Sequence, residues 1–354
     1  MKVKLVIFDL DGTLANTLTD ITKSVNVFPV SYTHLTEAGE DVTLVNRNVI
    51  QVSALQKQGA TVTGKAEKRV PVKAVTPEMM KGVYDAIFLM TKQTDNETSA
   101  RYLEPFLGES GVLVTMQNGM PELLLEELLG KNRVIGCAVG WGATLTGPGV
   151  SELTSEPDEL NFDLGRLAGG TDEKLEEVRC VLEKMGNARI RENFIGMRWS
   201  KLLINAAFSG MSTVLGCTFG EVAQDGVGVR CAQAVIKECI DTAHAGGVQF
   251  EPVEGKDIAK LFDYKGIFKK FLSRRLIPIA IRAHRGIKAS MLQDIEKGKP
   301  CEIDAINGVV CVAARREGIR TPICDKIVET VHRIEAGEIT PSMENRELFR
   351  PLIG

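Results

Sequence analysis

The first half of the chain alternates short apolar runs with helical stretches, and no other feature restricts the fold as strongly. Hydrophobic runs at residues 41–46, 84–90, 111–116 and 133–139 are the expected strands. Residues 48–58 and 121–129 carry helical periodicity, and Pro121 suits the first position of the second helix. Strands and helices that alternate in this order are typical of parallel βαβ units. The pattern therefore predicts an N-terminal α/β domain.

Strand signals fade beyond Thr171, where long segments of helical periodicity begin. These segments span residues 171–185, 197–215, 227–245, 256–297 and 302–316, with Gly or Pro between them. An all-α C-terminal half is therefore predicted, with the boundary at residues 186–193. Two domains in this order would leave a cleft between them in which a cofactor and a small substrate can meet.

Composition and charge argue against several functional classes. The 354 residues, 44% of them hydrophobic, are enough for two well-buried domains. A net charge of -3 argues against nucleic-acid binding. The sequence has no apolar stretch long enough for a membrane span and no secretory signal, so a cytoplasmic protein without membrane contact is expected. The eight cysteines form no Cys-x-x-Cys pair, which predicts reduced, mostly buried thiols and no bound metal.

The chain opens with an apolar run, residues 3–10, that suits the first strand of the predicted sheet. The run ends in Asp-x-Asp-Gly-Thr, which resembles the nucleophile motif of haloacid dehalogenase-type phosphatases. This resemblance implies a Mg²⁺-dependent phosphatase in which Asp9 attacks phosphorus, Asp11 acts as general acid and base, and Thr13 assists in positioning. Later motifs of that family, such as Gly-Asp-x-x-x-Asp, do not occur in the sequence. A phosphatase is the alternative function, and a strand followed by a polar turn is the purely structural explanation.

Two segments of the second half carry polar residues that suggest chemistry. Lys201 and Asn205 are four residues apart on a predicted helix (WSKLLINA, residues 199–206) that is otherwise almost entirely apolar. A later segment, SMLQDIEKGKPCEIDAING, supplies Ser290, Glu302, Asp304 and Asn307. Structural explanations stay open for both segments. Lys201 could be a surface lysine whose stem covers apolar surface, and Glu302 a carboxylate that complements a helix dipole.

Together with residues 90–92 (MTK) and 116–120 (MQNGM), these segments resemble the signature stretches of ketopantoate reductases. The similarity covers about residues 36–348. It implies a Rossmann-like NADP-binding domain over 36–190, with its first strand and glycine loop replaced, and an all-α substrate domain of the 6-phosphogluconate dehydrogenase C-terminal type over 191–348. The implied activity is NADPH-dependent reduction of 2-dehydropantoate (ketopantoate) to pantoate in pantothenate and coenzyme A biosynthesis. Related 2-oxo acids stay open as substrates, and so does a homodimer.

The resemblance also implies roles for individual residues. Lys201 matches the catalytic lysine and Glu302 the essential glutamate, while Asn118 matches an asparagine that faces both cofactor and substrate. Lys92 would lie near the cofactor, and Gly142, in a later Gly-x-Gly loop, is a further cofactor-binding candidate. The residues expected to contact substrate are Asn118, Asn205, Ser290 and Ser209, the last of which stands where many members have an asparagine.

Arg47 bears on cofactor choice because it follows the strand at 41–46, where many dinucleotide enzymes carry an acid for the ribose hydroxyls of NAD. An arginine there suits the 2′-phosphate of NADPH, although it could also cap a loop. The Gly-x-Gly-x-x-Gly turn that the family places before this strand is absent ahead of Thr36. Asp9 and Asp11 would occupy its place, and two carboxylates repel a diphosphate. Weak NADPH binding is therefore expected.

Residues 27–35 (VFPVSYTHL) fit neither family and resemble a translated adapter sequence. Residues 1–35 are therefore interpreted as a phosphatase-like start plus a bridge, ahead of an incomplete reductase domain, as in a chimeric sequence. A non-enzymatic explanation also stays open, in which the helical half serves only as a dimer interface. It would leave Lys201 and Glu302 without a common geometry.

Overall fold

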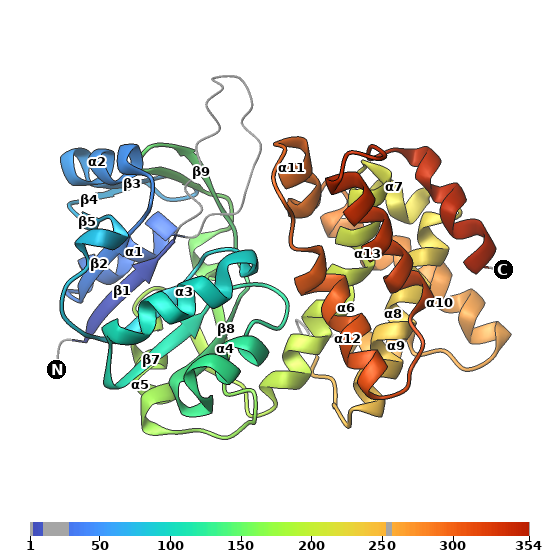
Figure 1. Cartoon of the computed structure of the whole chain (residues 1–354), viewed down its shortest axis with the longest axis horizontal. Helices are drawn as coiled ribbons and strands as arrows, with labels where there is room; N and C mark the ends of the chain where they lie inside the picture. The colour runs from blue at the N-terminus through green and yellow to red at the C-terminus, as the bar shows by residue number, and fades with distance from the viewer. Residues whose placement is uncertain (1–2, 10–27, 253–256, 354) are drawn as a thin grey trace. The chain divides into compact units, whose positions relative to one another are not determined.

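The chain forms two compact units, Met1–Phe194 and Ile195–Gly354, which are drawn in Figure 1. The computed structural model describes residues 3–9, 28–252 and 257–353. The first unit combines strands and helices. The described part of the second unit consists of helices and one isolated bridge between Thr218 and Lys288. The predicted fold class, an α/β domain followed by an all-α domain, is confirmed.

An eight-stranded sheet forms the centre of the first unit, in the order β12-β11-β8-β7-β6-β1-β2-β5. Neighbouring strands from β5 to β8 are all parallel, β11 is antiparallel to β8, and β12 is parallel to β11. The four strands expected between residues 41 and 139 are present, with ends shifted by at most four residues. The strands are β1 (Lys4–Phe8), β2 (Asp41–Val45), β5 (Lys73–Val75), β6 (Tyr84–Leu89), β7 (Leu107–Thr115), β8 (Val134–Val139), β11 (Asn161–Gly165) and β12 (Asn187–Ile190).

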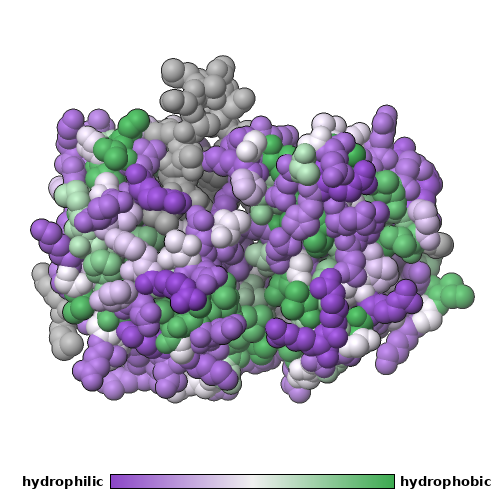
Figure 2. Space-filling model, viewed as in Figure 1, coloured by the Kyte–Doolittle hydropathy of each residue, from purple (hydrophilic) through white to green (hydrophobic). Residues whose placement is uncertain are grey.

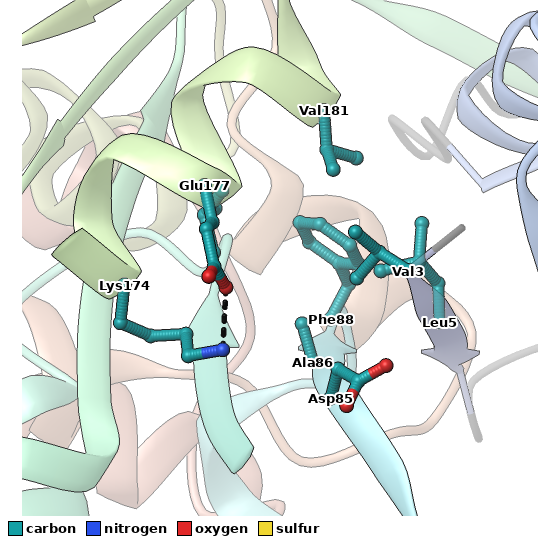
Figure 3. Close-up of a pocket in the computed structure, with 9 residues that line it drawn as sticks. Val3, Leu5, Asp85, Ala86, Phe88, Lys174, Glu177 and Val181 are labelled. Atoms are coloured by element: carbon teal, nitrogen blue, oxygen red, sulfur yellow. Dashed lines mark hydrogen bonds and ion pairs between the residues drawn. The ribbon is translucent and has the colours of Figure 1, made fainter. Parts of the chain in front are cut away.

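β1 lies inside this sheet, between β2 and β6. Leu5 and Ile7 belong to one hydrophobic cluster, and Val6 and Phe8 belong to another, as expected of a strand that is buried on both faces. Figure 3 shows α5 (Glu173–Leu182) beside β1 and β6, where Val3, Leu5 and Val181 line a small hollow. The expectation that the apolar opening of the chain takes the first strand position is confirmed.

The helices of the first unit begin and end at residues suited to those positions. The side chain of Asn48 accepts hydrogen bonds from the backbone N–H groups of Ile50 (2.9 Å) and Gln51 (3.2 Å) at the start of α2. α2 ends at Gln58, and the φ of 78° at the next residue, Gly59, favours glycine. α4 begins one residue after Pro121, so Pro121 precedes this helix instead of opening it as predicted. The helices are α1 (Phe28–Glu37), α2 (Val49–Gln58), α3 (Asn96–Leu103), α4 (Glu122–Leu129) and α5, with short 3-10 turns η1 (Pro77–Met79), η2 (Gln93–Asp95), η3 (Glu104–Phe106), η4 (Lys131–Arg133) and η5 (Pro157–Glu159).

Helix α1 contains most of the segment that fits neither family by sequence. Val30 and Leu35 are at most 1% exposed and belong to the same hydrophobic cluster as Leu5 and Ile7. Two of the nine residues in the segment are therefore part of the core of the first unit.

Some strands were missed by the hydrophobic pattern. A second sheet has the order β4-β3-β10-β9, and its strands are short and partly exposed, so they form no clear apolar run. β12 was also not predicted: it lies within the predicted domain boundary at residues 186–193, and its polar Asn187 and Arg189 hide the strand signal. The strands of the second sheet are β3 (Ala60–Gly64), β4 (Lys68–Val70), β9 (Ala143–Gly147) and β10 (Val150–Leu153).

The second unit contains the helices expected over 197–215, 227–245 and 302–316, but the segment 256–297 is not one helix. Gly266, with a φ of 85°, separates α9 from α10, and a 3-10 turn follows α10 a few residues after Pro278. α7 and α13 were not predicted. The elements are α6 (Phe194–Leu215), α7 (Phe219–Gln224), α8 (Gly228–Ala245), α9 (Ile258–Phe262), α10 (Ile267–Ala280), η6 (Arg282–His284), α11 (Ser290–Glu296), η7 (Asp304–Gly308), α12 (Val309–Arg316), α13 (Pro322–Glu335) and η8 (Met343–Leu352).

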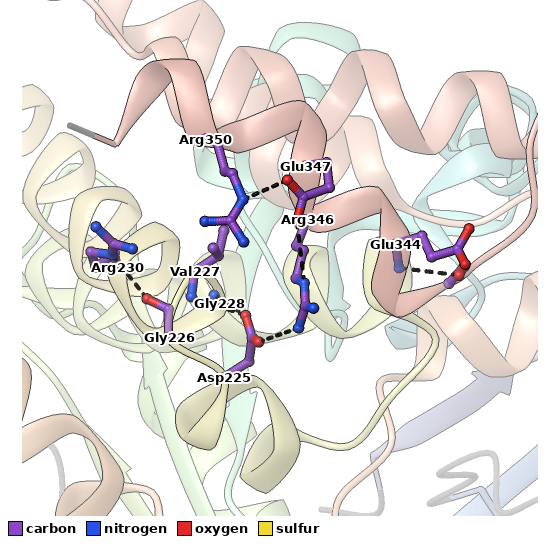
Figure 4. A network of polar contacts seen from close by, with 10 residues as sticks. Asp225, Gly226, Val227, Gly228, Arg230, Glu344, Arg346, Glu347 and Arg350 are labelled. Carbon is purple, nitrogen blue, oxygen red and sulfur yellow. Dashed lines mark hydrogen bonds and ion pairs between the residues drawn. The ribbon is translucent and has the colours of Figure 1, made fainter.

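Asp225 joins the start of α8 to the C-terminal turn η8, as Figure 4 shows. Its Oδ1 accepts hydrogen bonds from the N–H groups of Val227 (3.0 Å) and Gly228 (2.7 Å), and its Oδ2 lies 2.8 Å from Arg346 Nη1. Burial opposes the charged form of Asp225, but these hydrogen bonds outweigh it and lower the pKa of the carboxyl. The carboxylate therefore stabilises the folded state above its unfolded pKa, and this stabilisation is lost as pH falls through the lower, folded pKa.

We expect Asp225→Ala to reduce the free energy of unfolding by about 0.5–2 kcal/mol near neutral pH, because the helix loses its cap. Urea unfolding followed by circular dichroism measures the change. Asp225→Asn is the matched control, since it keeps a capping oxygen and loses only the charge, so its loss should be smaller. Equal losses for the two variants would contradict a capping role.

Most cysteines of the chain are buried. All eight cysteines are free, and all but Cys180 are buried. Burial raises the pKa of the Cys217 and Cys231 thiols to about 12 in each case. Thiols with such pKa values are unreactive, and the prediction of mostly buried thiols is confirmed. None of the helices in the described residues combines the length and apolar character needed to cross a bilayer.

Candidate active site

The carboxyl ends of four parallel strands carry the residues expected to bind the cofactor. The chain reaches Arg47, Lys92, Asn118 and Gly142 two or three residues after the ends of β2, β6, β7 and β8. Open α/β sheets bind ligands at this edge. The first unit alone therefore brings the four predicted residues to one edge of one sheet.

Arg47 lies beside a surface that suits a nucleotide. Its Nη2 is 3.1 Å from Asp95 Oδ2, and the two side chains are 54% and 40% exposed. An exposed ion pair of this kind contributes little to stability, so Arg47 can exchange Asp95 for a phosphate at small cost. Val49 and Ile50, in the first turn of α2, are 68% and 63% exposed and offer apolar surface to a purine ring. These residues fit a 2′-phosphorylated nucleotide.

Gln117 connects the loops that follow β6 and β7, and sequence reasoning did not assign it a role. Its Nε2 donates to the Thr91 carbonyl and to Asn96 Oδ1, each at 2.7 Å, and the side chain is 6% exposed. The exposed Asn118 follows it, and the carbonyl of Asn118 accepts a hydrogen bond from Gln93. These bonds fix the backbone that presents Lys92 and Asn118. The only signal for Gln117 in the sequence was its place in the motif MQNGM, residues 116–120.

Two residues at this edge fit a diphosphate less well. The N–H of Gly142 donates to Ser155 Oγ (3.1 Å) and its carbonyl accepts from the Thr154 N–H (3.1 Å), so both backbone groups are already engaged. Asp9 follows β1 and is 2% exposed, with its N–H bonded to the Val45 carbonyl at 3.0 Å. Asp11 and Thr13, the other residues expected of a phosphatase, lie outside the described residues.

Lys201, Asn205 and Ser209 lie at intervals of four residues on α6 and share one face of that helix. Lys201 and Asn205 are half-buried, and Ser209 is 5% exposed. The Ser209 hydroxyl donates to Asn205 Oδ1 at 2.7 Å. This bond orients the Asn205 amide so that Nδ2 is the group suited to donate to a carboxylate.

The other predicted substrate residues lie on segments bonded to neighbouring helices of the second unit. α11 begins at the exposed Ser290, and the N–H of the preceding Ala289 donates to Ser212 Oγ of α6 at 3.3 Å. Glu302 is half-buried and lies just before η7. The N–H of Cys301 donates to Glu335 Oε1 of α13 at 2.7 Å. The second unit alone therefore carries Lys201, Asn205, Ser209, Ser290 and Glu302.

Basic side chains are present on α10, where Lys269, Lys270 and Arg275 are exposed. The same helix also exposes apolar side chains, including Ile267 (89%) and Phe268 (82%). Figure 2 shows apolar groups at the surface near the place that Figure 1 gives to α10.

In the part of the chain that the structure describes, no three His, Cys, Asp or Glu side chains are placed together to hold an ion.

The folds of the two units, each taken by itself, indicate a class of protein. A Rossmann-like unit followed by an all-helical unit with a half-buried lysine defines the two-domain, dinucleotide-dependent oxidoreductases.

Comparison with known proteins identifies the family within this class. Two family profiles match the chain: "Ketopantoate reductase PanE/ApbA" over residues 30–166 and "Ketopantoate reductase PanE/ApbA C terminal" over residues 193–335. Together they span most of the chain, and the chain belongs to the ketopantoate reductase family. The first match begins at Val30, inside the segment 27–35 that fitted neither family by sequence.

Individual relatives carry the family's name, and solved structures share the fold. The chain is 29% identical to a 2-dehydropantoate 2-reductase of Pyrococcus horikoshii, over 82% of this chain and 88% of that protein. It is 25% identical to the 2-dehydropantoate 2-reductase of Aquifex aeolicus, over 84% of this chain and 90% of that protein. The fold matches a ketopantoate reductase of Ralstonia eutropha with a TM-score of 0.75 at 20% identity, covering 95% of this chain and 99% of that one. A D-mandelate dehydrogenase with NADH and anilino(oxo)acetate matches with a TM-score of 0.74 at 19% identity and the same coverage.

Proposed function

We propose that this chain reduces 2-dehydropantoate to pantoate with NADPH, as its relatives' names indicate for them, in pantothenate and coenzyme A biosynthesis. The observation that carries the proposal is the face of α6. Lys201 and Asn205 lie there one turn apart, on a helix whose Leu202, Leu203 and Ala206 are buried. A lysine and an oriented amide at this spacing suit a keto acid, which offers a carbonyl oxygen and a carboxylate.

The residue types fit the chemistry of ketone reduction. Bound NADPH would supply the hydride that the carbonyl carbon accepts, and negative charge would grow on the carbonyl oxygen. The Lys201 ammonium stabilises that charge and gives its proton to the oxygen. Glu302 accepts a hydrogen bond from the substrate hydroxyl and orients the lysine. Asn205 and Ser290 donate hydrogen bonds to the substrate, and Ser209 acts through Asn205.

Arg47, Lys92 and Asn118 are the residues proposed to hold NADPH, with Arg47 on the 2′-phosphate. Gly142 contributes less than its place in the sequence suggested, because its backbone groups are engaged. The Asp9 carboxylate at the end of β1 weakens the cofactor's diphosphate binding. A start of foreign origin, joined ahead of the family's residues, is the proposed reason that an acid stands there. Sequencing the gene from its source across codons 20–45 tests this origin.

We expect Arg47→Ala to raise the KM for NADPH about 10- to 100-fold and to leave the KM for NADH nearly unchanged, because only NADPH carries the 2′-phosphate. Steady-state rates with each cofactor measure the two constants. Asp95→Asn is the control, since it removes the competing partner of Arg47 and should lower the KM for NADPH. Equal effects of Arg47→Ala on both cofactors would contradict the assignment.

The decisive experiment follows the absorbance of NADPH in the presence of ketopantoate. Oxidation with ketopantoate, faster than with shorter or unbranched 2-oxo acids, supports the proposal. Preference for another 2-oxo acid would assign a related reductase. Release of phosphate from a phosphomonoester with Mg²⁺, without NADPH oxidation, would favour the phosphatase alternative. A cytoplasmic location and a homodimer belong to the proposal, and sedimentation tests the dimer, for which the apolar side chains of α10 are the candidate contact.

A further inference from the structure

Asn307 is a buried polar side chain that the proposed chemistry does not use. It lies in the π-helical turn η7, is 0% exposed, and its Nδ2 donates to the carbonyl of Ala206 in α6 at 3.0 Å. Its Oδ1 has no hydrogen-bond partner among the described residues. A buried oxygen without a partner is destabilising, so stability alone does not account for an asparagine at this position.

The backbone of α6 is shaped to admit this side chain. Gly210 lies one turn after Ala206, on the same face of the helix. A Cβ atom at Gly210 would lie 2.7 Å from Asn307 Oδ1 and 2.7 Å from Ile327 Cγ2, which is closer than real contacts allow. The hydrogen bond between η7 and α6 therefore depends on a glycine in α6 as well as on the asparagine.

The bond joins the two segments that carry the proposed catalytic pair. Its acceptor, Ala206, follows Asn205 directly and lies five positions after Lys201, and its donor, Asn307, lies five positions after Glu302. The N–H groups of Ala305 and Ile306 both bond to the Glu302 carbonyl at 3.1 Å, so Glu302 is attached to the same turn. Short π-helical stretches are frequent at functional sites.

A second bond holds the other end of the Glu302 segment. Glu335 Oε1 of α13 accepts the Cys301 N–H at 2.7 Å, and Glu335 Oε2 lies 3.1 Å from His332 Nδ1. His332 Nε2 in turn lies 3.0 Å from Asp304 Oδ1. Glu302 thus lies between two residues held by α13, and Asn307 provides the connection to α6.

We propose that Asn307 is a positioning residue. Through its bond to the Ala206 carbonyl, it sets the place of residues 301–307, which carry Glu302, relative to Lys201. The proposal rests on the proposed function for the roles of Lys201 and Glu302. Gly210 is part of the same device, because a larger residue there would displace the asparagine side chain. A misplacement of about 1 Å in such a pair can reduce the rate about 100-fold.

Asn307→Leu tests the proposal. Leucine has the same branched shape and the same number of side-chain heavy atoms, so the variant loses the bond and also the unpaired oxygen, and its melting temperature should stay within a few degrees of the parent. We expect its kcat to fall about 10- to 100-fold, with the KM for NADPH unchanged. Asn345→Leu is the matched control. Asn345 Nδ2 also donates to a carbonyl of α6, that of Val214, at 2.9 Å. Val214 lies thirteen positions after Lys201, so the kcat of Asn345→Leu should equal that of the parent.

A readout independent of turnover separates this proposal from the proposed function. Lysines are labelled by reductive ¹³C-methylation, and the Lys201 signal, assigned by its absence in Lys201→Arg, is titrated by NMR. Its titration should change in Asn307→Leu and stay the same in Asn345→Leu. The Lys201 titration could change in Asn307→Leu while neither the parent nor any variant oxidises NADPH with ketopantoate. That result would support the positioning role of Asn307 and contradict the proposed reaction.

Two results would overturn the proposal. One is an Asn307→Leu variant with parental kcat and a parental Lys201 titration. The other is a loss of activity that is proportional to the loss of folded protein in every variant, so that the activity per folded molecule is unchanged. Gly210→Ala guards against a folding defect specific to leucine: it leaves Asn307 in the sequence, and a folded Gly210→Ala protein with parental kcat and Lys201 titration also contradicts the proposal.

Discussion

Lys201→Ala should lower the turnover of NADPH-dependent ketopantoate reduction by about 10²- to 10⁴-fold, the range typical of losing a general acid. The variant should fold normally, because Lys201 is half-buried and its removal leaves the apolar positions of α6 intact. Stopped-flow and steady-state rates, measured with saturating cofactor, give the effect on the chemical step. Circular dichroism and urea unfolding show whether the fold is intact.

Two further variants sharpen this test. Lys269→Ala removes an exposed lysine of α10 and should leave turnover unchanged. Lys201→Arg keeps the positive charge but holds its proton too tightly to donate it, so its turnover should remain low. A Lys201→Ala protein that is folded and fully active would refute the assignment of this residue as the proton donor.

Asp9→Gly/Asp11→Gly/Leu14→Gly should raise NADPH affinity by a factor of ten or more. The three changes, together with the native Leu10, Gly12 and Thr13, produce the spacing of a Gly-x-Gly-x-x-Gly turn directly after β1. They remove two carboxylates. A carboxylate repels a phosphate charge 4 Å away by about 1–4 kcal/mol even where solvent screens the pair, and a tenfold gain in affinity needs about 1.4 kcal/mol. Titration of NADPH fluorescence measures both dissociation constants.

Asp9→Asn/Asp11→Asn separates the two causes of this effect. It removes the charges without freeing the backbone, so it should recover part of the affinity, and the glycine variant should recover more. Micromolar affinity in the parent chain would contradict the predicted weakness. So would a glycine variant that binds no better than the parent.

The fold was largely predictable where a strand consists mainly of apolar residues. Strands β1, β2, β6, β7 and β8 are buried, and their apolar runs stand out. β12 and the second sheet were missed because polar or partly exposed residues interrupt their apolar positions, so no continuous apolar run marks these strands. Apolar residues recur at helical spacing on both sides of Gly266 in the segment 256–297, which predicted one helix. Gly266 instead adopts a φ of 85° and separates α9 from α10.

The candidate site was predictable to the level of residue types and faces. The spacing of Lys201 and Asn205 alone places them on one face of a helix, and the strand ends place Arg47, Lys92 and Asn118 at one sheet edge. The engaged backbone of Gly142 could not be foreseen, because its partners Thr154 and Ser155 directly follow β10, a strand that the pattern missed. Gln117 and Asn307 lie in motifs that were visible in the sequence, but no role could be assigned to either. Their hydrogen bonds reach residues 21 and 101 positions away in the chain.

The central place of β1 has a consequence for how this polypeptide can be shortened. Its neighbours β2 and β6 each form a full register with it, Lys4 to Phe8 against Asp41 to Val45 and Leu5 to Phe8 against Ala86 to Leu89. Deleting the first nine residues would split the sheet and expose two apolar strands with unsatisfied backbone groups, which is a template for aggregation. Whatever its ancestry, the opening segment is needed for solubility, so variants of this region must be made by substitution and not by truncation.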